Sequence, residues 1–291
     1  MQNKSGVLGH RIAFLLAIIL TLLLSSCFTP RSTHYASSVM EYLYPKESGY
    51  VVEPGIPVLS LPLRVGIAFV PAGHSYSWRT GKITESKKTE IMDKVADHFR
   101  KYKFVKSIEV IPSPYLKPMG GFANLEQLRT MYGLDVIALV SVDQTQFTDD
   151  NFLSITYWTI VGAYVVPGNK NDTHTMIDVA VYDIKSRKFL FRAPGISQVK
   201  GLSTAVGIQQ RLRQDRERGL TLSADKMIIS LDQQLQLFRK KVKQRPKEYT
   251  VRYREGYSGG AGGGSIDPYV LLLMALMAGL LAWSLPSRRR D

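Results

Sequence analysis

Residues 136–142 read Val-Ile-Ala-Leu-Val-Ser-Val, and this apolar run decides the fold. A continuous run of aliphatic and β-branched residues is typical of a strand that is buried on both faces. The run follows closely after Gly133, which ends a short helical pattern, so a helix leads almost directly into the strand. This junction predicts a sheet with helices packed against it.

The preceding segments alternate between strand and helix patterns. Leu63–Val70 is an apolar strand candidate that ends at a proline, and 104–111 is the next strand candidate. A helix from Thr84 or Ser86 to about Lys101 is expected between them. Its apolar positions share one face, which predicts a core contact through Ile91, Val95, Phe99 and Tyr102. The spacing Asn124-x-x-Gln127 predicts a capping box for a second, short helix that Gly133 ends.

The second half changes character, with long strand candidates followed by helices. Strands are expected over 151–166, 174–184 and 188–199, and a tight turn at 185–187 predicts an antiparallel pair. Asp149 and Asp150 lie between two strand candidates, which favours a turn, with a cation site as the alternative. Helices are expected over 203–218 and 223–243. The second helix carries an apolar stripe that is expected to be core, formed by Met227, Ile228, Leu231, Leu235, Phe238 and Val242.

The chain is therefore predicted to hold one globular domain of mixed α/β (α+β) class. Its small mixed sheet is built from β-α-β-α-β and then antiparallel strands, closed by C-terminal helices. The domain is placed at 63–245. A largely irregular, proline-rich spacer is expected over 27–62, with a short helix over 37–44 as an open alternative, and a flexible glycine-rich linker is expected over 246–268.

The amino terminus has the layout of a secretory signal peptide over residues 1–26. Lys4 and Arg11 precede an apolar run of about 13 residues, which is too short to span a bilayer comfortably. The run ends in Leu24-Ser25-Ser26-Cys27, and Cys27 is the only cysteine of the chain. This spacing resembles a bacterial lipobox, with small residues before a thiol that diacylglycerol alkylates. The alternative is an ordinary signal peptide with an incidental cysteine.

A single cysteine excludes an intramolecular disulfide and a cysteine-built metal cluster. A triacylated Cys27 would supply the several acyl chains that stable membrane anchoring needs. Phe28 follows the cysteine, where an aspartate would resemble an inner-membrane retention signal. The expected location is therefore a bacterial cell envelope, lipid-anchored at the outer membrane or the cell surface.

The carboxyl terminus carries a second apolar segment. A side-chain-poor stretch reads Gly259-Gly260-Ala261-Gly262-Gly263-Gly264-Ser265. Residues 269–285 follow without a charge and are long enough to cross a bilayer as one transmembrane helix. Arg288-Arg289-Arg290 lie in the basic tail 286–291, which the positive-inside rule keeps cytoplasmic. Hydropathy alone also permits a plain, permanent tail anchor.

Glycine-rich linker, apolar span and terminal arginines in this order resemble the GlyGly-CTERM sorting signal, which rhombosortase, an intramembrane serine protease of the rhomboid type, processes. Together with the lipobox, this tail resembles the rhombotail lipoprotein family. The resemblance covers the two ends of the chain and implies three partners: the lipoprotein-processing machinery, a rhomboid-type sorting protease and membrane lipid. It implies no ligand or protein partner for the domain itself.

The formal net charge is +14, and removing residues 1–26 and 266–291 still leaves 33 basic and 22 acidic residues. Basic residues concentrate in two stretches, 211–218 and 239–247. This excess predicts contact with anionic lipid headgroups or acidic polymers, or forms a solvated helix face. Nucleic acid is not expected as a partner, because no recognition motif of that class is present.

No catalytic, metal-binding or cofactor-binding pattern is found in the sequence. His34, His74, His98 and His174 are scattered without metal-ligand spacing, and no G-x-S-x-G elbow is present. The sequence therefore predicts a non-enzymatic envelope lipoprotein. Two alternatives stay open: a permanently bitopic protein with an uncut tail, and an enzyme whose site is assembled from distant residues. A histidine that meets a carboxylate in a cleft would favour the enzyme.

Overall fold

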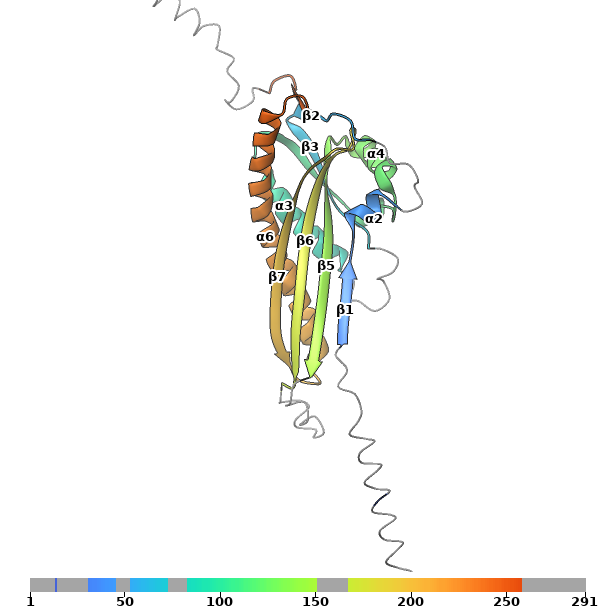
Figure 1. The fold of residues 1–291 in the computed structure, drawn as a ribbon, viewed down its shortest axis with the longest axis vertical. Coiled ribbons are helices and arrows are strands. Elements are labelled where there is room, and N and C mark those ends of the chain that lie inside the picture. Colours follow the sequence, from blue (N-terminus) through green and yellow to red (C-terminus); the bar gives the residue numbers. More distant parts are fainter. Residues whose placement is uncertain (1–13, 15–30, 46–52, 73–82, 151–166, 258–291) are drawn as a thin grey trace, which may run out of the picture.

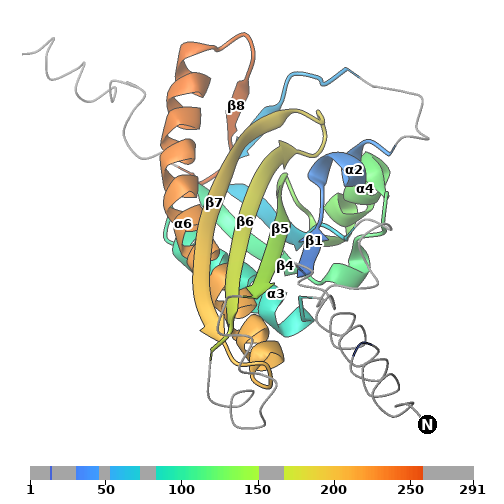
Figure 2. The same ribbon diagram turned by 60° about the horizontal axis from the view of Figure 1, so that its bottom comes forward.

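The computed structural model describes residues 14, 31–45, 53–72, 83–150 and 167–257. In this part of the chain, a six-stranded mixed sheet carries helices on both faces (Figures 1 and 2). The predicted mixed α/β class is thereby confirmed. The sheet has the strand order β4-β3-β5-β6-β7, and β1 pairs with β5 outside this path.

The predicted β-α-β-α-β order is confirmed. The central strand β3 is parallel to both β4 and β5, as right-handed helical crossovers require. Thr84 caps α3 by accepting the N–H of Lys87, and Gly133 ends α4 in the left-handed conformation with φ 66°. The elements are β3 (Leu63–Phe69), α3 (Glu85–Phe99), β4 (Val105–Ile111), the short 3-10 helix η2 (Ser113–Tyr115), α4 (Gly121–Tyr132) and β5 (Val136–Asp150).

The capping box predicted at Asn124 is wrong. Gly120 precedes α4, and Asn124 lies inside the helix with a buried side chain. Its amide oxygen accepts the hydroxyl of Tyr42 at 2.9 Å and the N–H of Lys117 at 2.9 Å. The side chain therefore ties α2 to the segment before α4, a contact that its sequence spacing does not reveal.

Three long antiparallel strands form the other half of the sheet: β5, β6 (Asn169–Asp183) and β7 (Phe189–Ser203). Each has 15 residues and is therefore about 50 Å long. The turn at 185–187 joins β6 to β7 as predicted. The turn predicted at Asp149 and Asp150 is wrong, because β5 continues to Asp150 in register with Asn169. The strand predicted over 151–166 lies outside the described residues.

The irregular spacer predicted over 27–62 is wrong in two places, where β1 (Arg31–Ala36) and β2 (Val58–Leu61) form. The short helix considered over 37–44 is present as α2 (Val39–Leu43). The second half of β5 extends beyond β3, which leaves an edge that β1 pairs with. The linker predicted over 246–268 is likewise wrong at β8 (Thr250–Tyr253), which pairs in parallel with β2.

The two C-terminal helices predicted over 203–218 and 223–243 are one helix, α6 (Ile208–Gln244). Gly219, which lies between the two predicted helices, marks a close approach to the sheet, since a Cβ there would lie 2.5 Å from Thr175 Oγ1. The predicted apolar stripe is confirmed as core. Met227, Ile228, Leu231 and Phe238 are buried, and Leu235 and Val242 pack against them.

Two apolar clusters lie on opposite faces of the sheet. One is formed with α3 and α6, and the other with α2 and α4. The N-terminal half of α6 instead meets the sheet through a buried polar layer. Gln144 donates to Thr175 Oγ1 and to the Arg216 carbonyl, and Ser197 donates to the Gly219 carbonyl. These bonds satisfy polar groups that burial would otherwise penalise.

Candidate functional site

The chain enters the described domain through β1. This strand begins at Arg31, four residues after Cys27, and Arg31 pairs with Thr148 near the end of β5. The lipobox residues Leu24 to Cys27 lie outside the described residues. A lipid on Cys27 would therefore be within about 14 Å of the end of the domain where β5 finishes and β6 starts (Figure 1).

The chain leaves the described domain through β8, which is fixed to the sheet by a cluster of two arginines around the carboxylate of Asp135. Asp135 accepts the side chain of Arg64 at 2.9 Å and that of Arg254 at 2.7 and 2.8 Å. The hydrogen bond with Asp135 raises the pKa of Arg64 above its ordinary value. Arg254 follows β8 directly, so this cluster holds the last strand in place.

Sequence reasoning missed this cluster, because Asp135 and Arg254 are 119 positions apart and neither has a distinctive local pattern. The predicted processing region, Gly259 to Ser265, and the arginines Arg288 to Arg290 lie outside the described residues. The last described residue is Tyr257, two positions before the glycine run.

The two exits lie at opposite ends of the domain (Figure 1). The helix α6 connects these ends, and its 37 residues correspond to about 55 Å. The two predicted membrane signals would therefore be attached at opposite ends of the long axis of the domain.

One histidine cluster joins α3 to α6. His98 Nε2 lies 2.7 Å from Asp232, and Tyr102 donates its hydroxyl to the same carboxylate at 2.6 Å. Burial opposes ionisation of Asp232, but the hydrogen bonds from Tyr102 and His98 outweigh it and hold the pKa of Asp232 below its ordinary value. The hydrogen bond to Asp232, with burial, raises the pKa of Tyr102. Among the described residues, no serine or threonine hydroxyl forms a hydrogen bond with His98, and the contacts shown join α3 to α6.

Two further histidines lie on the sheet face opposite α6. His34 and His174 both pair with Thr145 across neighbouring strands. His34 Nε2 is 2.8 Å from Asp143, and His174 Nε2 is 3.3 Å from Asp172. Both pairs are partly exposed to solvent. His74 lies outside the described residues.

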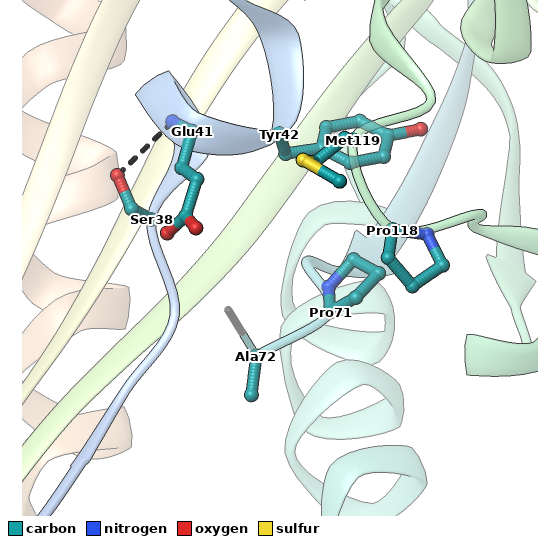
Figure 3. Close-up of a pocket in the computed structure, with 7 residues that line it drawn as sticks. All are labelled: Ser38, Glu41, Tyr42, Pro71, Ala72, Pro118 and Met119. Atoms are coloured by element: carbon teal, nitrogen blue, oxygen red, sulfur yellow. Dashed lines mark hydrogen bonds between the residues drawn. The ribbon is translucent and has the colours of Figure 1, made fainter. Parts of the chain in front are cut away.

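The pocket shown in Figure 3 is a shallow hollow between α2 and the segments after β3 and η2. Its cavity volume of about 10 Å³ is the room that one water molecule needs, far below that of a small-molecule site. Ser38 lines it but already accepts the N–H of Glu41 as the cap of α2. The other lining residues are Glu41, Tyr42, Pro71, Ala72, Pro118 and Met119.

Among the described residues, no group of three or more histidine, cysteine or carboxylate side chains is arranged to hold a metal ion. The alternative of a cation site at Asp149 and Asp150 therefore finds no third ligand of these types in that part of the chain. No helix in the described ranges is both long and apolar enough to cross a membrane. The span predicted over 269–285 lies outside those ranges.

Asp232→Asn is expected to lower the free energy of unfolding by less than about 1 kcal/mol at pH 7, because the side chain is partly exposed and solvent screens it. A lowered folded-state pKa stabilises the fold above the unfolded pKa, and this stabilisation is lost as pH falls through the folded value. Urea unfolding should therefore show less acid sensitivity below about pH 4 in the variant than in the wild type.

Asp225→Asn is the matched control, since Asp225 also joins α6 to α3 through a pair with Lys94 but is more exposed. It removes a carboxylate from the same helix–helix contact without touching His98 or Tyr102, so the two variants together separate the effect of those hydrogen bonds from the loss of an ion pair. Equal acid profiles for wild type and Asp232→Asn would contradict the role given to the His98 and Tyr102 hydrogen bonds.

Comparison with known proteins gives distant structural matches. The PelC dodecamer from Paraburkholderia phytofirmans is 13% identical, with coverage of 69% of this chain and 95% of that chain and a TM-score of 0.26. A protein described as a homologue of the neuraminyllactose-binding hemagglutinin, from Helicobacter pylori, is 8% identical, with coverage of 68% and 97% and a TM-score of 0.31. No family model and no curated protein matches the sequence. Neither structural match indicates a function for this chain.

Proposed function

We propose that this chain is a non-enzymatic lipoprotein of a bacterial cell envelope, lipidated at Cys27 and carrying a C-terminal sorting tail. One observation carries the proposal: the elements of the domain begin and end beside the two signals. β1 starts four residues after Cys27, and β8 ends six residues before Gly259. A domain that folds from the residues between two targeting signals needs neither signal to form its hydrophobic core.

The contacts at both exits support this organisation. β1 is paired along its whole length with β5, and β8 is fixed by Arg254 on Asp135. The first and last strands of the domain are thus held in place by contacts within the domain. A lipid or a membrane span can therefore be attached outside it. The histidine clusters support a structural role, because His98 joins α3 to α6 and His34 joins β1 to β5.

The tail is the part of the proposal that separates it from a permanently bitopic protein. Glycine destabilises a helix by about 1 kcal/mol per residue relative to alanine, so the run 259–264 gives a membrane protease a segment that unwinds easily. The three terminal arginines would hold the other side of the span in the cytoplasm. A rhomboid-type protease is the proposed partner for this segment.

The test is the intact mass of the mature chain from cells with and without that protease. Cells that have the protease should yield a chain lighter by the mass of the tail. Replacing Gly262, Gly263 and Gly264 with leucine should slow or stop processing, because the helix then extends across the cleavage region.

Ala275→Leu with Ala278→Leu is the matched control, since it adds leucines to the span and leaves the glycine run intact. Its mature mass should equal that of the wild type, apart from the extra mass of a leucine side chain wherever residue 275 or 278 is retained. A wild-type mature mass that includes residues 271–290 would show a permanent anchor and refute the sorting-signal proposal.

A further inference from the structure

The end of the domain where the chain leaves for the tail is strongly basic. We call residues 239–255, which form the last turns of α6, the following connection and β8, the basic end. It holds eight basic and two acidic residues. Of the two basic stretches in the last third of the sequence, the fold places 239–247 at this end of the long axis, whereas 211–218 lies in the first turns of α6, near the other end (Figure 1).

Most of this charge is not neutralised within the domain. Arg245 pairs with Glu248 at 3.2 Å, and Arg254 pairs with Asp135. In the described ranges, no carboxylate forms an ion pair with the other six basic residues, Arg239, Lys240, Lys241, Lys243, Lys247 and Arg252. Five of these six are exposed, which is the arrangement that attracts an anionic surface.

Aromatic side chains accompany the charge. Tyr253 is 64% exposed, and its ring stacks on that of Tyr257 with centroids 6.2 Å apart. Arg239 lies over the ring of Phe104, which follows the exposed Lys103 and so extends the basic surface to the start of β4. Exposed tyrosine beside basic residues is the combination that favours the interface between a bilayer and water.

We propose that the basic end docks on the anionic phospholipid headgroups of the bilayer that holds the tail. The inference rests on the proposed function, because the tail supplies the proximity. Eleven residues separate Tyr257 from Tyr269, so the basic end lies within about 40 Å of the span. Charge complementarity supplies the attraction, and each lysine or arginine near the surface raises the binding constant about fivefold. The same charges would bind an acidic polymer, which the experiment separates.

The experiment uses the full chain with Cys27→Ser, so that a cysteine placed at Gln244 can be labelled with a fluorophore. The chain is reconstituted into vesicles of phosphatidylcholine alone or mixed with phosphatidylglycerol, both carrying a headgroup quencher. Flotation measures the tail anchor, and quenching measures docking. We expect flotation with both vesicle types and quenching only with phosphatidylglycerol, lost at high salt as screening requires.

Lys240→Glu with Lys243→Glu should reduce the ratio of docked to undocked domain by more than about tenfold. Arg213→Glu with Arg218→Glu is the matched control, with the same charge change on exposed residues of the same helix about 40 Å away. It should leave quenching unchanged, and a label at Gln214 should stay unquenched.

Equal quenching in both vesicle types, or equal loss in both variants, would overturn the docking proposal while flotation leaves the tail anchor intact. If polygalacturonate changes the emission at position 244 and phosphatidylglycerol does not, the partner is an acidic polymer and the proposal is wrong. Failure to float with neutral vesicles would instead refute the tail anchor, and phosphatidylglycerol-dependent quenching in that case would still support docking.

Discussion

Cys27→Ser is expected to abolish fatty-acid labelling of the chain. Acylation needs a thiolate nucleophile, and a serine hydroxyl cannot replace it at neutral pH. The chain has no second cysteine that could take over the modification. Metabolic labelling with a fatty acid, followed by purification of the chain, gives the result directly. The variant should also lose membrane retention wherever the tail has been removed, since no other anchor is then proposed.

Ser26→Ala is the matched control, because it keeps a small residue beside the cleavage position and leaves the thiol in place. It should be labelled like the wild type. Undiminished labelling of Cys27→Ser would contradict the lipoprotein proposal, whereas loss of labelling in both variants would point to a defect in export or recognition of the signal.

Gly195→Ala is expected to destabilise the domain by about 3 kcal/mol or more. The added Cβ would lie 2.1 Å from the Ser223 carbonyl oxygen and 2.4 Å from the Met227 nitrogen. Both are backbone atoms of α6, so no side chain can rotate away and the helix must shift from β7. That shift would break the buried bond between Ser223 and Ser197 and loosen Met227, which is fully buried.

Gly55→Ala is the matched control, because its Cβ would meet Ser186 at 3.7 Å, an ordinary van der Waals contact. Its free energy of unfolding should stay within about 1 kcal/mol of the wild type. Urea unfolding followed by circular dichroism measures both variants. A Gly195→Ala variant as stable as Gly55→Ala would mean that α6 packs against β7 less closely than the structure shows.

The elements that follow simple periodicity were predictable from the sequence. The run at 136–142 predicted the buried first half of β5, and the spacing of Ile91, Val95 and Phe99 predicted the buried face of α3. These patterns are local, because each reports which side of an element meets the core. The order of parallel and antiparallel strands then followed from loop lengths and handedness.

The failures share a cause, since each depends on a partner far away in the chain. β8 contains four of the residues that looked like a linker, and it forms because β2, about 190 positions earlier, offers an edge. The helix α6 was predicted as two helices because its first half has no apolar stripe, and the face that meets the sheet there buries Asp215, Gly219 and Ser223. A buried polar residue can be recognised only once its hydrogen-bond partners are known.

The candidate sites divide in the same way. The lipobox and the glycine run are proposed as linear signals, and a signal of this kind is defined by consecutive residues, so the sequence is where it can be recognised. The contact of Asp135 with Arg254 has no linear signature and emerged only from the fold.

The chain enters and leaves the domain at opposite ends, and this determines which orientations the domain can take on a membrane. A domain standing on its N-terminal lipid would hold Tyr257 about 50 Å above the bilayer, given the length of α6. The eleven residues between Tyr257 and Tyr269 reach about 40 Å even when fully extended. With both anchors in one bilayer the domain must therefore lean over, and only a chain that has lost its tail can stand upright. Cutting the tail would then change the height at which the far end of the protein works, and not only how firmly the protein is held.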